Sequence, residues 1–191
     1  MEWTPEDTED LRNLRNYLDS DNIKLKQQIK QKLLSDKFLI HVLNNKELEE
    51  SDAEPSDYFG VNILSYYMIP ETQTDVQNFI CFETSTDMRY GSAMKNQMII
   101  FYILCDDKNA IDKDTSLPRH DLLAALIQRL FNYDRFMGGR FQLVSDVPSI
   151  TDTHYLTRTM KFLQVTDNNL VKTINGKPKI INKDYTEATQ V

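Results

Sequence analysis

The sequence contains only two cysteines, five glycines and three histidines among its 191 residues. Two cysteines without a Cys-x-x-Cys spacing exclude a disulfide framework and a cysteine-based zinc site. Cys81 and Cys105 fall in apolar segments, so we expect buried free thiols. His41, His120 and His154 lie far apart with no partner one helical turn away, which argues against a metal site built from them. We therefore predict no bound metal and no cofactor.

Long apolar runs and an excess of basic residues are also missing. No apolar run could span a bilayer, and the first residues lack the basic end and apolar stretch of a signal peptide. We expect no membrane association and production in a cytoplasm. Acidic residues outnumber basic ones by 29 to 22, a net charge of −7. Binding to nucleic-acid phosphates needs the opposite balance on one surface, so this charge argues against a duplex-binding protein.

Sequence motifs of catalysis are missing as well. We find no Gly-rich nucleotide loop, serine nucleophile elbow or pair of catalytic carboxylates. Arg119-His120-Asp121 contains a potential acid–base pair, but the helix dipole also favours an aspartate in a first turn, and adjacent helical residues do not face each other. The aspartates between Asp106 and Asp114 lack the spacing and the glycine of a calcium loop. Gly138-Gly139 follows a predicted helix and so ends it. We predict that the protein is not an enzyme.

The composition that is present predicts one globular α+β domain over residues 1–166. Forty per cent of the residues are hydrophobic, with nine Tyr and nine Phe, which is ordinary for a folded domain. Capping residues and apolar periodicity predict a helical region over residues 5–44, with helices over about 5–18, 22–34 and 36–43. The acidic stretch from Asn45 to Asp57 is expected to be an exposed loop.

Residues 78–166 are expected to form the core of the sheet, in the order β-β-α-β-β. Residues 79–84 and 98–105 are rich in β-branched and aromatic side chains and predict two antiparallel strands. The second is apolar at both alternating sets of positions, which favours a central strand covered on both faces. An apolar stripe then predicts one long amphipathic helix that begins near Pro118 and ends before Gly138. Residues 141–144 and 155–165 predict two more strands, joined by a loop that contains Pro148.

Two further segments are candidates for contacts with other molecules. Residues 57–74 are apolar and aromatic but include Pro70, so we expect an irregular or edge segment. Asn175-Gly176 predicts a C-terminal hairpin within residues 167–191, followed by a mobile tail from Asp184. The side chains predicted to form an interface are Tyr66, Tyr67, Ile69, Val171, Ile174 and Ile180.

The order of elements resembles the tail-terminator and related neck proteins that join head and tail in long-tailed bacteriophages of Gram-positive bacteria. The resemblance covers roughly residues 22–166. It is carried by the element order. Four phrases are also similar to small uncharacterised proteins encoded among the neck and tail genes of phages and prophages of Gram-positive bacteria, namely Tyr66 to Thr74, Phe101 to Cys105, Arg119 to Leu123 and Tyr155 to Phe162. The N-terminal helices, residues 58–74 and the hairpin at 170–181 exceed what a minimal terminator needs, which leaves open a neighbouring neck protein.

The resemblance implies a virion protein, assembled in the host cytoplasm as a homo-oligomeric ring with six expected subunits. Its implied partners are the tail tube and the head-side neck proteins, and DNA passes through only as non-specific cargo. The acidic excess suits such a channel, because attraction to phosphate would hinder passage. Two alternatives stay open, namely a cytoplasmic adaptor or regulatory protein that binds a partner through its N-terminal helices, and a hydrolase with a dispersed site. A deep pocket gathering His120, Asp121 and another titratable group would favour the hydrolase.

Overall fold

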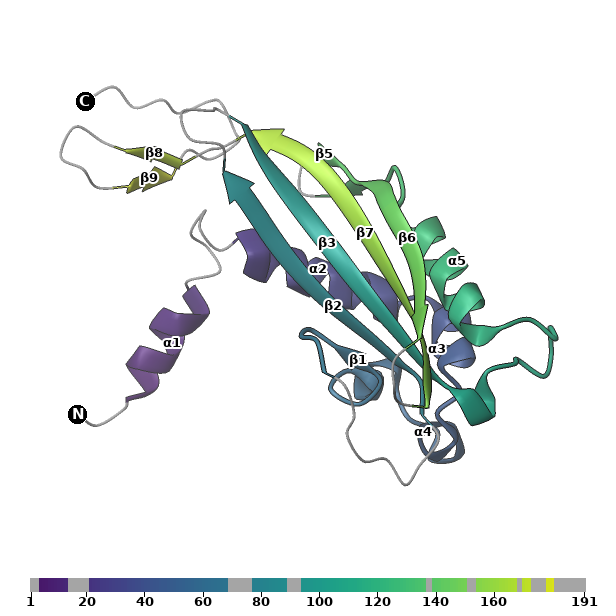
Figure 1. The fold of residues 1–191 in the computed structure, drawn as a ribbon. Coiled ribbons are helices and arrows are strands. Elements are labelled where there is room, and N and C mark those ends of the chain that lie inside the picture. Colours follow the sequence, from purple (N-terminus) through teal and green to yellow (C-terminus); the bar gives the residue numbers. More distant parts are fainter. Residues whose placement is uncertain are drawn as a thin grey trace.

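The protein is an α+β fold in which helices lie on one face of a five-stranded, mainly antiparallel sheet (Figure 1). A computed structural model describes residues 4–13, 21–68, 77–88, 94–136, 139–150, 154–167, 170–172 and 178–180. The predicted fold class is confirmed, including the helical N-terminal region and the β-β-α-β-β order of the sheet and its long helix.

The sheet is built around two long strands, β3 (Met94–Asp106) and β7 (Tyr155–Asp167), which pair antiparallel along their whole length. β2 (Phe79–Met88) pairs antiparallel with β3, and β6 (Gln142–Ile150) pairs antiparallel with β7. The four predicted strands are therefore confirmed. A fifth, β1 (Ile63–Leu64), adds to β2 in parallel and lies in the segment expected to be irregular or at an edge.

The N-terminal helices begin where capping side chains were expected. In α1 (Pro5–Asn13) the Thr4 hydroxyl accepts a hydrogen bond from the Asp7 amide, and the Asp7 carboxylate accepts one from the Thr4 amide at 2.8 Å. α2 (Asp21–Leu34) is followed by α3 (Lys37–Leu43). The Asp36 carboxylate caps α3 by accepting from the amides of Phe38 and Leu39. These caps satisfy amides that the first helical turn leaves unpaired.

The long helix α5 (Arg119–Phe131) supplies the apolar stripe that closes the core. Leu123, Ile127 and Phe131 are buried on it, and the Phe131 ring lies 4.9 Å from that of Phe101 on β3. Residues of α2 and α3 complete the same cluster. These are Leu25, Ile29, Leu33, Leu39, Val42 and Leu43. All three helices therefore bury one apolar stripe against one face of the sheet, which is the main hydrophobic contribution to stability.

Three local predictions were wrong. The acidic stretch after Asn45 is not only a loop, because α4 (Lys46–Glu50), capped by the Asn45 side chain, and the 3-10 helix η3 (Pro55–Tyr58) form within it. α5 ends at Phe131, since the chain leaves the helical conformation at Asn132 and Tyr133, which has a φ of 59°. A two-residue strand pair, β4 (Arg135–Phe136) and β5 (Gly139–Arg140), follows instead.

Pro148 was also misplaced, because it lies within β6 and not in a loop. β6 is an outer strand, where a residue without a backbone donor is tolerated. The predicted C-terminal hairpin is confirmed for β8 (Leu170–Lys172) and β9 (Pro178–Ile180), an antiparallel pair separate from the main sheet. It extends past one end of the sheet (Figure 1). Asn175-Gly176 and the tail from Asp184 lie outside the described residues.

Candidate functional site

The face of the sheet opposite the helices carries apolar side chains that the described residues leave partly uncovered. Along β3, burial alternates from residue to residue up to Tyr102. Ile99 and Phe101 are fully buried on the helix side. Met98, Ile100 and Tyr102 point to the other side and are only half-buried. The prediction that this central strand is covered on both faces is therefore wrong for most of its length.

Cross-strand pairing brings further apolar side chains onto the same side. Tyr102 pairs with Thr159, which pairs with Val147 on β6. Met98 pairs with Leu163, and Asn96 pairs with Val165. Val147 and Val165 are each 53% exposed. We define the open face as Met98, Ile100, Tyr102, Val147, Leu163 and Val165. Glu83 and Lys161 pair with Ile100 on the same side, so charged side chains are interspersed with the apolar ones. Exposed apolar surface of this kind can mark an interaction site.

One end of the open face is closed by a second, smaller apolar cluster. It consists of Leu64, Phe79, Cys81, Leu104 and Tyr155, with Tyr102 packed against it. The Tyr67 ring lies 4.4 Å from that of Tyr102, and the Cys81 thiol donates to the Met68 carbonyl at 3.8 Å. The segment after β1 thus borders the open face and leaves Tyr66 and Tyr67 50% and 44% exposed.

The predicted interface residues are only partly brought together. Tyr67 lies at the border of the open face, where its ring contacts that of Tyr102, and Tyr66 is exposed next to it in the chain. Val171 and Ile180 belong to β8 and β9, and Ile69 and Ile174 lie outside the described residues. The sequence analysis did not identify the valines of β6 and β7 as exposed. The mixture of apolar and polar residues in 155–165 was a usable signal, because it is typical of a strand with one face in solvent. In the sequence, an apolar residue on an exposed sheet face has the same local pattern as a core residue.

The β6 edge of the sheet resists the addition of another strand. On β6, Pro148 provides no backbone donor, and the register shifts between Leu143 and Ser145. Beside β2, helix α2 is held by Lys26, whose ammonium donates to Glu83 at 2.7 Å, and by a contact between Asn22 and Thr86 at 3.2 Å. Prolines, bulges and a covering helix are the usual protection of sheet edges.

The cysteines are buried free thiols, as predicted. Burial raises the pKa of Cys105 to about 12. Burial also raises the pKa of Cys81. The thiolate is the reactive form of cysteine, so neither side chain is a nucleophile near neutral pH.

Each of the three histidines contacts a different aspartate. His120 Nε2 is 3.4 Å from Asp121 Oδ1, so these adjacent side chains do meet, contrary to the expectation from helical spacing. They meet because Asp121 turns toward the guanidinium of Arg158 on β7, which also donates to Asp146 at 2.6 Å. The hydrogen bond to Asp146 raises the pKa of Arg158. His41 and His154 contact Asp114 and Asp107. Among the described residues, no three potential ligands converge on a metal position.

A family model described as YomW matches residues 36–163. This range starts before α3 and includes all five strands of the main sheet except the last residues of β7. No curated protein matches the chain. Within the described residues, every helix is too short or too polar to cross a membrane.

Proposed function

The chain belongs to the YomW family, and from this we propose that it is a self-assembling structural subunit of a tailed-phage virion. The observation that supports self-assembly is the open face. Its half-exposed apolar side chains, with Tyr66 and Tyr67 at the border, would gain hydrophobic free energy if another chain covered them. A second copy of the same chain is the occupant we propose.

Closed rings are built from head-to-tail contacts in which two different patches meet. The ring would form by packing the open face of one copy against another surface of its neighbour. The tyrosines at the border suit such a contact, since tyrosine combines apolar area with a polar end. The protein would then act by shape and assembly, with no chemical reaction.

The assignment of the protein to the neck of the virion rests on the resemblance to neck and tail-terminator proteins. In that role the subunits would form a ring, six in number, between the tail tube and the head-side neck proteins. DNA would pass through it as non-specific cargo, which agrees with a net charge of −7. Assembly would take place in the host cytoplasm and the finished ring would remain in the virion.

We expect the purified protein to sediment as a discrete oligomer, and a Val147→Lys/Val165→Lys variant to dissociate at least about tenfold more readily. Two lysines buried in an apolar contact would be costly to desolvate. Sedimentation velocity at several protein concentrations measures the effect. The matched control is Leu117→Lys, which adds a charge at another exposed apolar position and should leave the oligomer unchanged.

A strictly monomeric wild-type protein would contradict self-assembly and favour the adaptor alternative. Equal dissociation of the Leu117→Lys control would show that added charge, and not the open face, is responsible. Thermal melting of each variant checks that the fold is intact, because all three positions are exposed and should tolerate lysine.

The C-terminal hairpin gives a second test of assembly. Deleting residues 168–191 should leave the melting temperature nearly unchanged and weaken self-association or docking to a tail tube. The reason is that β8 and β9 pair only with each other in the described structure, and a lone two-stranded hairpin is marginally stable in water. Melting and sedimentation of the truncated protein measure both effects. A sharp fall in melting temperature with an unchanged oligomer would place the hairpin in the core of its own subunit.

A further inference from the structure

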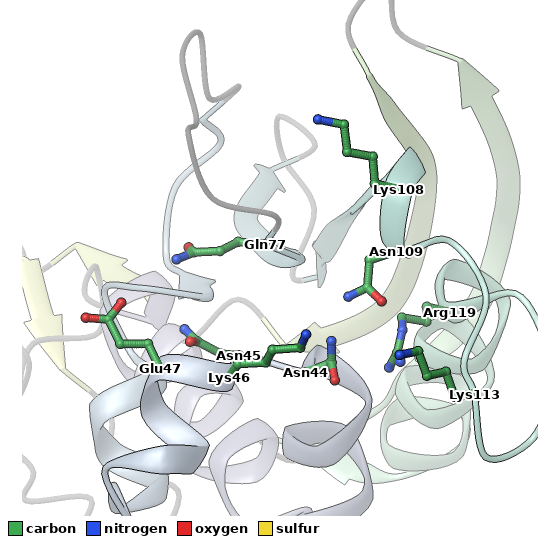
Figure 2. Close-up of a pocket in the computed structure, with 9 residues that line it drawn as sticks. All are labelled: Asn44, Asn45, Lys46, Glu47, Gln77, Lys108, Asn109, Lys113 and Arg119. Atoms are coloured by element: carbon green, nitrogen blue, oxygen red, sulfur yellow. The ribbon is translucent and has the colours of Figure 1, made fainter.

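A polar pocket of about 480 Å³ lies where the start of α4 faces the chain that leads into α5 (Figure 2). Among the described residues, four cationic side chains, four side-chain amides and one carboxylate line it. The volume is within the range of small-molecule sites. The described lining residues are all polar or charged, whereas most such sites are largely apolar. The lining therefore favours a ligand with several polar groups.

The floor of the pocket is held by a chain of buried amides. Asn45 is 3% exposed, and its amide donates to Asn62 at 2.7 Å while its oxygen accepts from the Leu48 amide. Asn62 donates in turn to the backbone carbonyl of Asn78 at 2.9 Å. Asn78 donates to the Leu43 carbonyl at the end of α3. Satisfied buried networks of this kind are rigid, so the floor is formed before any ligand arrives.

Two buried donors at the pocket have no acceptor among the described residues. Arg119 is 4% exposed, and its Nη1 is held by Asp112 at 3.0 Å and by the Val42 carbonyl at 3.1 Å. Its Nε has no partner, and neither has the amide nitrogen of Asn109 in the 3-10 helix η4 (Asp107–Asn109). Buried donors are nearly always paired in folded proteins. Both atoms have less than 1 Å² of accessible surface, so an acceptor in the pocket would reach them only after a lining side chain moved.

The rim of the pocket carries unneutralised positive charge. Lys46, Lys108 and Lys113 are exposed, and no ammonium among them forms an ion pair with another described residue. The one carboxylate, Glu47, lies at the end of the pocket opposite Arg119 and Lys113 (Figure 2). Three free ammonium groups around one hollow form a positive patch on a protein whose net charge is −7. Such a patch attracts anions.

We propose that this pocket binds a phosphomonoester carried by a small polar molecule, such as a sugar phosphate. The doubly charged phosphate would lie among the lysines, which act as point charges and bind phosphate in this way. The amides of Asn44 and Gln77 can bind hydroxyl groups, because an amide both donates and accepts. Inorganic phosphate carries the same charged group, so the experiment must distinguish it from a sugar phosphate.

The test is calorimetric titration of the full-length protein with ribose 5-phosphate, inorganic phosphate and ribose. We expect ribose 5-phosphate to bind more tightly than inorganic phosphate, and ribose not to bind. Lys46→Gln and Lys113→Gln should each weaken binding about tenfold, the effect of one charge-assisted hydrogen bond. Lys37→Gln, an exposed lysine on α3 outside the pocket, is the matched control and should bind like the wild type.

Several results would overturn the proposal. These are no binding of either phosphate at millimolar concentration, unchanged affinity in both pocket variants, or acetate binding as tightly as phosphate. Tighter binding of inorganic phosphate than of ribose 5-phosphate would exclude a sugar phosphate as the ligand. Tighter binding of a short oligonucleotide would assign the pocket to nucleic-acid backbone. As an independent readout, ribose 5-phosphate should raise the melting temperature of the wild type more than that of Lys113→Gln. None of these outcomes depends on the oligomeric state, so they test the pocket separately from the proposed self-assembly.

Discussion

Ile127→Asp is expected to prevent the protein from folding to a soluble product. Ile127 is fully buried in the centre of the α5 stripe, among residues of α2, α3 and the sheet. A carboxylate at this position would be desolvated without a partner, at a cost on the order of 5 kcal/mol. This is comparable with the whole stability of a typical domain, about 5–15 kcal/mol. Soluble yield, circular dichroism and thermal melting measure the effect.

The matched control for this change is Ala125→Asp, which puts the same charge on the same helix at an exposed position. Its cost should be limited to helix propensity, below about 1 kcal/mol. Folded Ile127→Asp protein with wild-type melting would contradict the assignment of α5 as the helix that closes the core. Equal loss in both variants would show that the helix tolerates no added charge on either face.

Arg119→Leu is expected to lower the free energy of unfolding by about 3–5 kcal/mol, the usual effect of removing one partner of a buried ion pair. Arg119 and Asp112 have side chains only 5% and 4% exposed, 3.0 Å apart. Without the guanidinium, Asp112 would be a buried charge with no cation, and the Val42 carbonyl would lose its donor. Chemical denaturation of the variant measures the loss.

The double variant Arg119→Leu/Asp112→Asn should be more stable than Arg119→Leu alone. An asparagine is neutral and can still accept the hydrogen bonds that Thr115 donates to residue 112. A double variant as unstable as the single one would contradict this account. It would mean that packing, and not the uncompensated charge, dominates the effect.

Acid titration provides a second measurement on the same pair. Burial opposes ionisation of Asp112, but the hydrogen bonds from Thr115 and the charge of Arg119 outweigh it, so its pKa lies below the ordinary value of 3.8. A depressed carboxylate pKa contributes stability that is fully present above the unfolded pKa and lost as the pH falls through the folded pKa. The wild type should therefore lose stability below about pH 3.8, and Asp112→Asn should lack this component.

The candidate sites were harder to predict than the fold. Tyr66 and Tyr67 were predicted to be interface residues because they belong to an aromatic segment. Both are exposed and the Tyr67 ring lies against Tyr102 of the open face, while their place in an interface stays a prediction. Val147 and Val165 were not identified, since a valine in a strand has the same local pattern whether a helix covers it or solvent does. The pocket around Arg119 was not found either, because its walls come from segments far apart in the sequence.

The sequence by itself determined the elements that local physics controls. Caps at Thr4 and Asp36, the stripe of α5 and the β-branched runs of β2, β3 and β7 are set by neighbours within a few residues, and these predictions were confirmed. Tertiary structure alone decided where α5 ends, that Ile63 and Leu64 join the sheet in parallel, and which face of β3 stays open. It also decided that Asn62 reaches Asn45 and that Arg119 reaches Asp112. Such contacts depend on long-range packing, which overrides local preference and leaves no periodic signal in the chain.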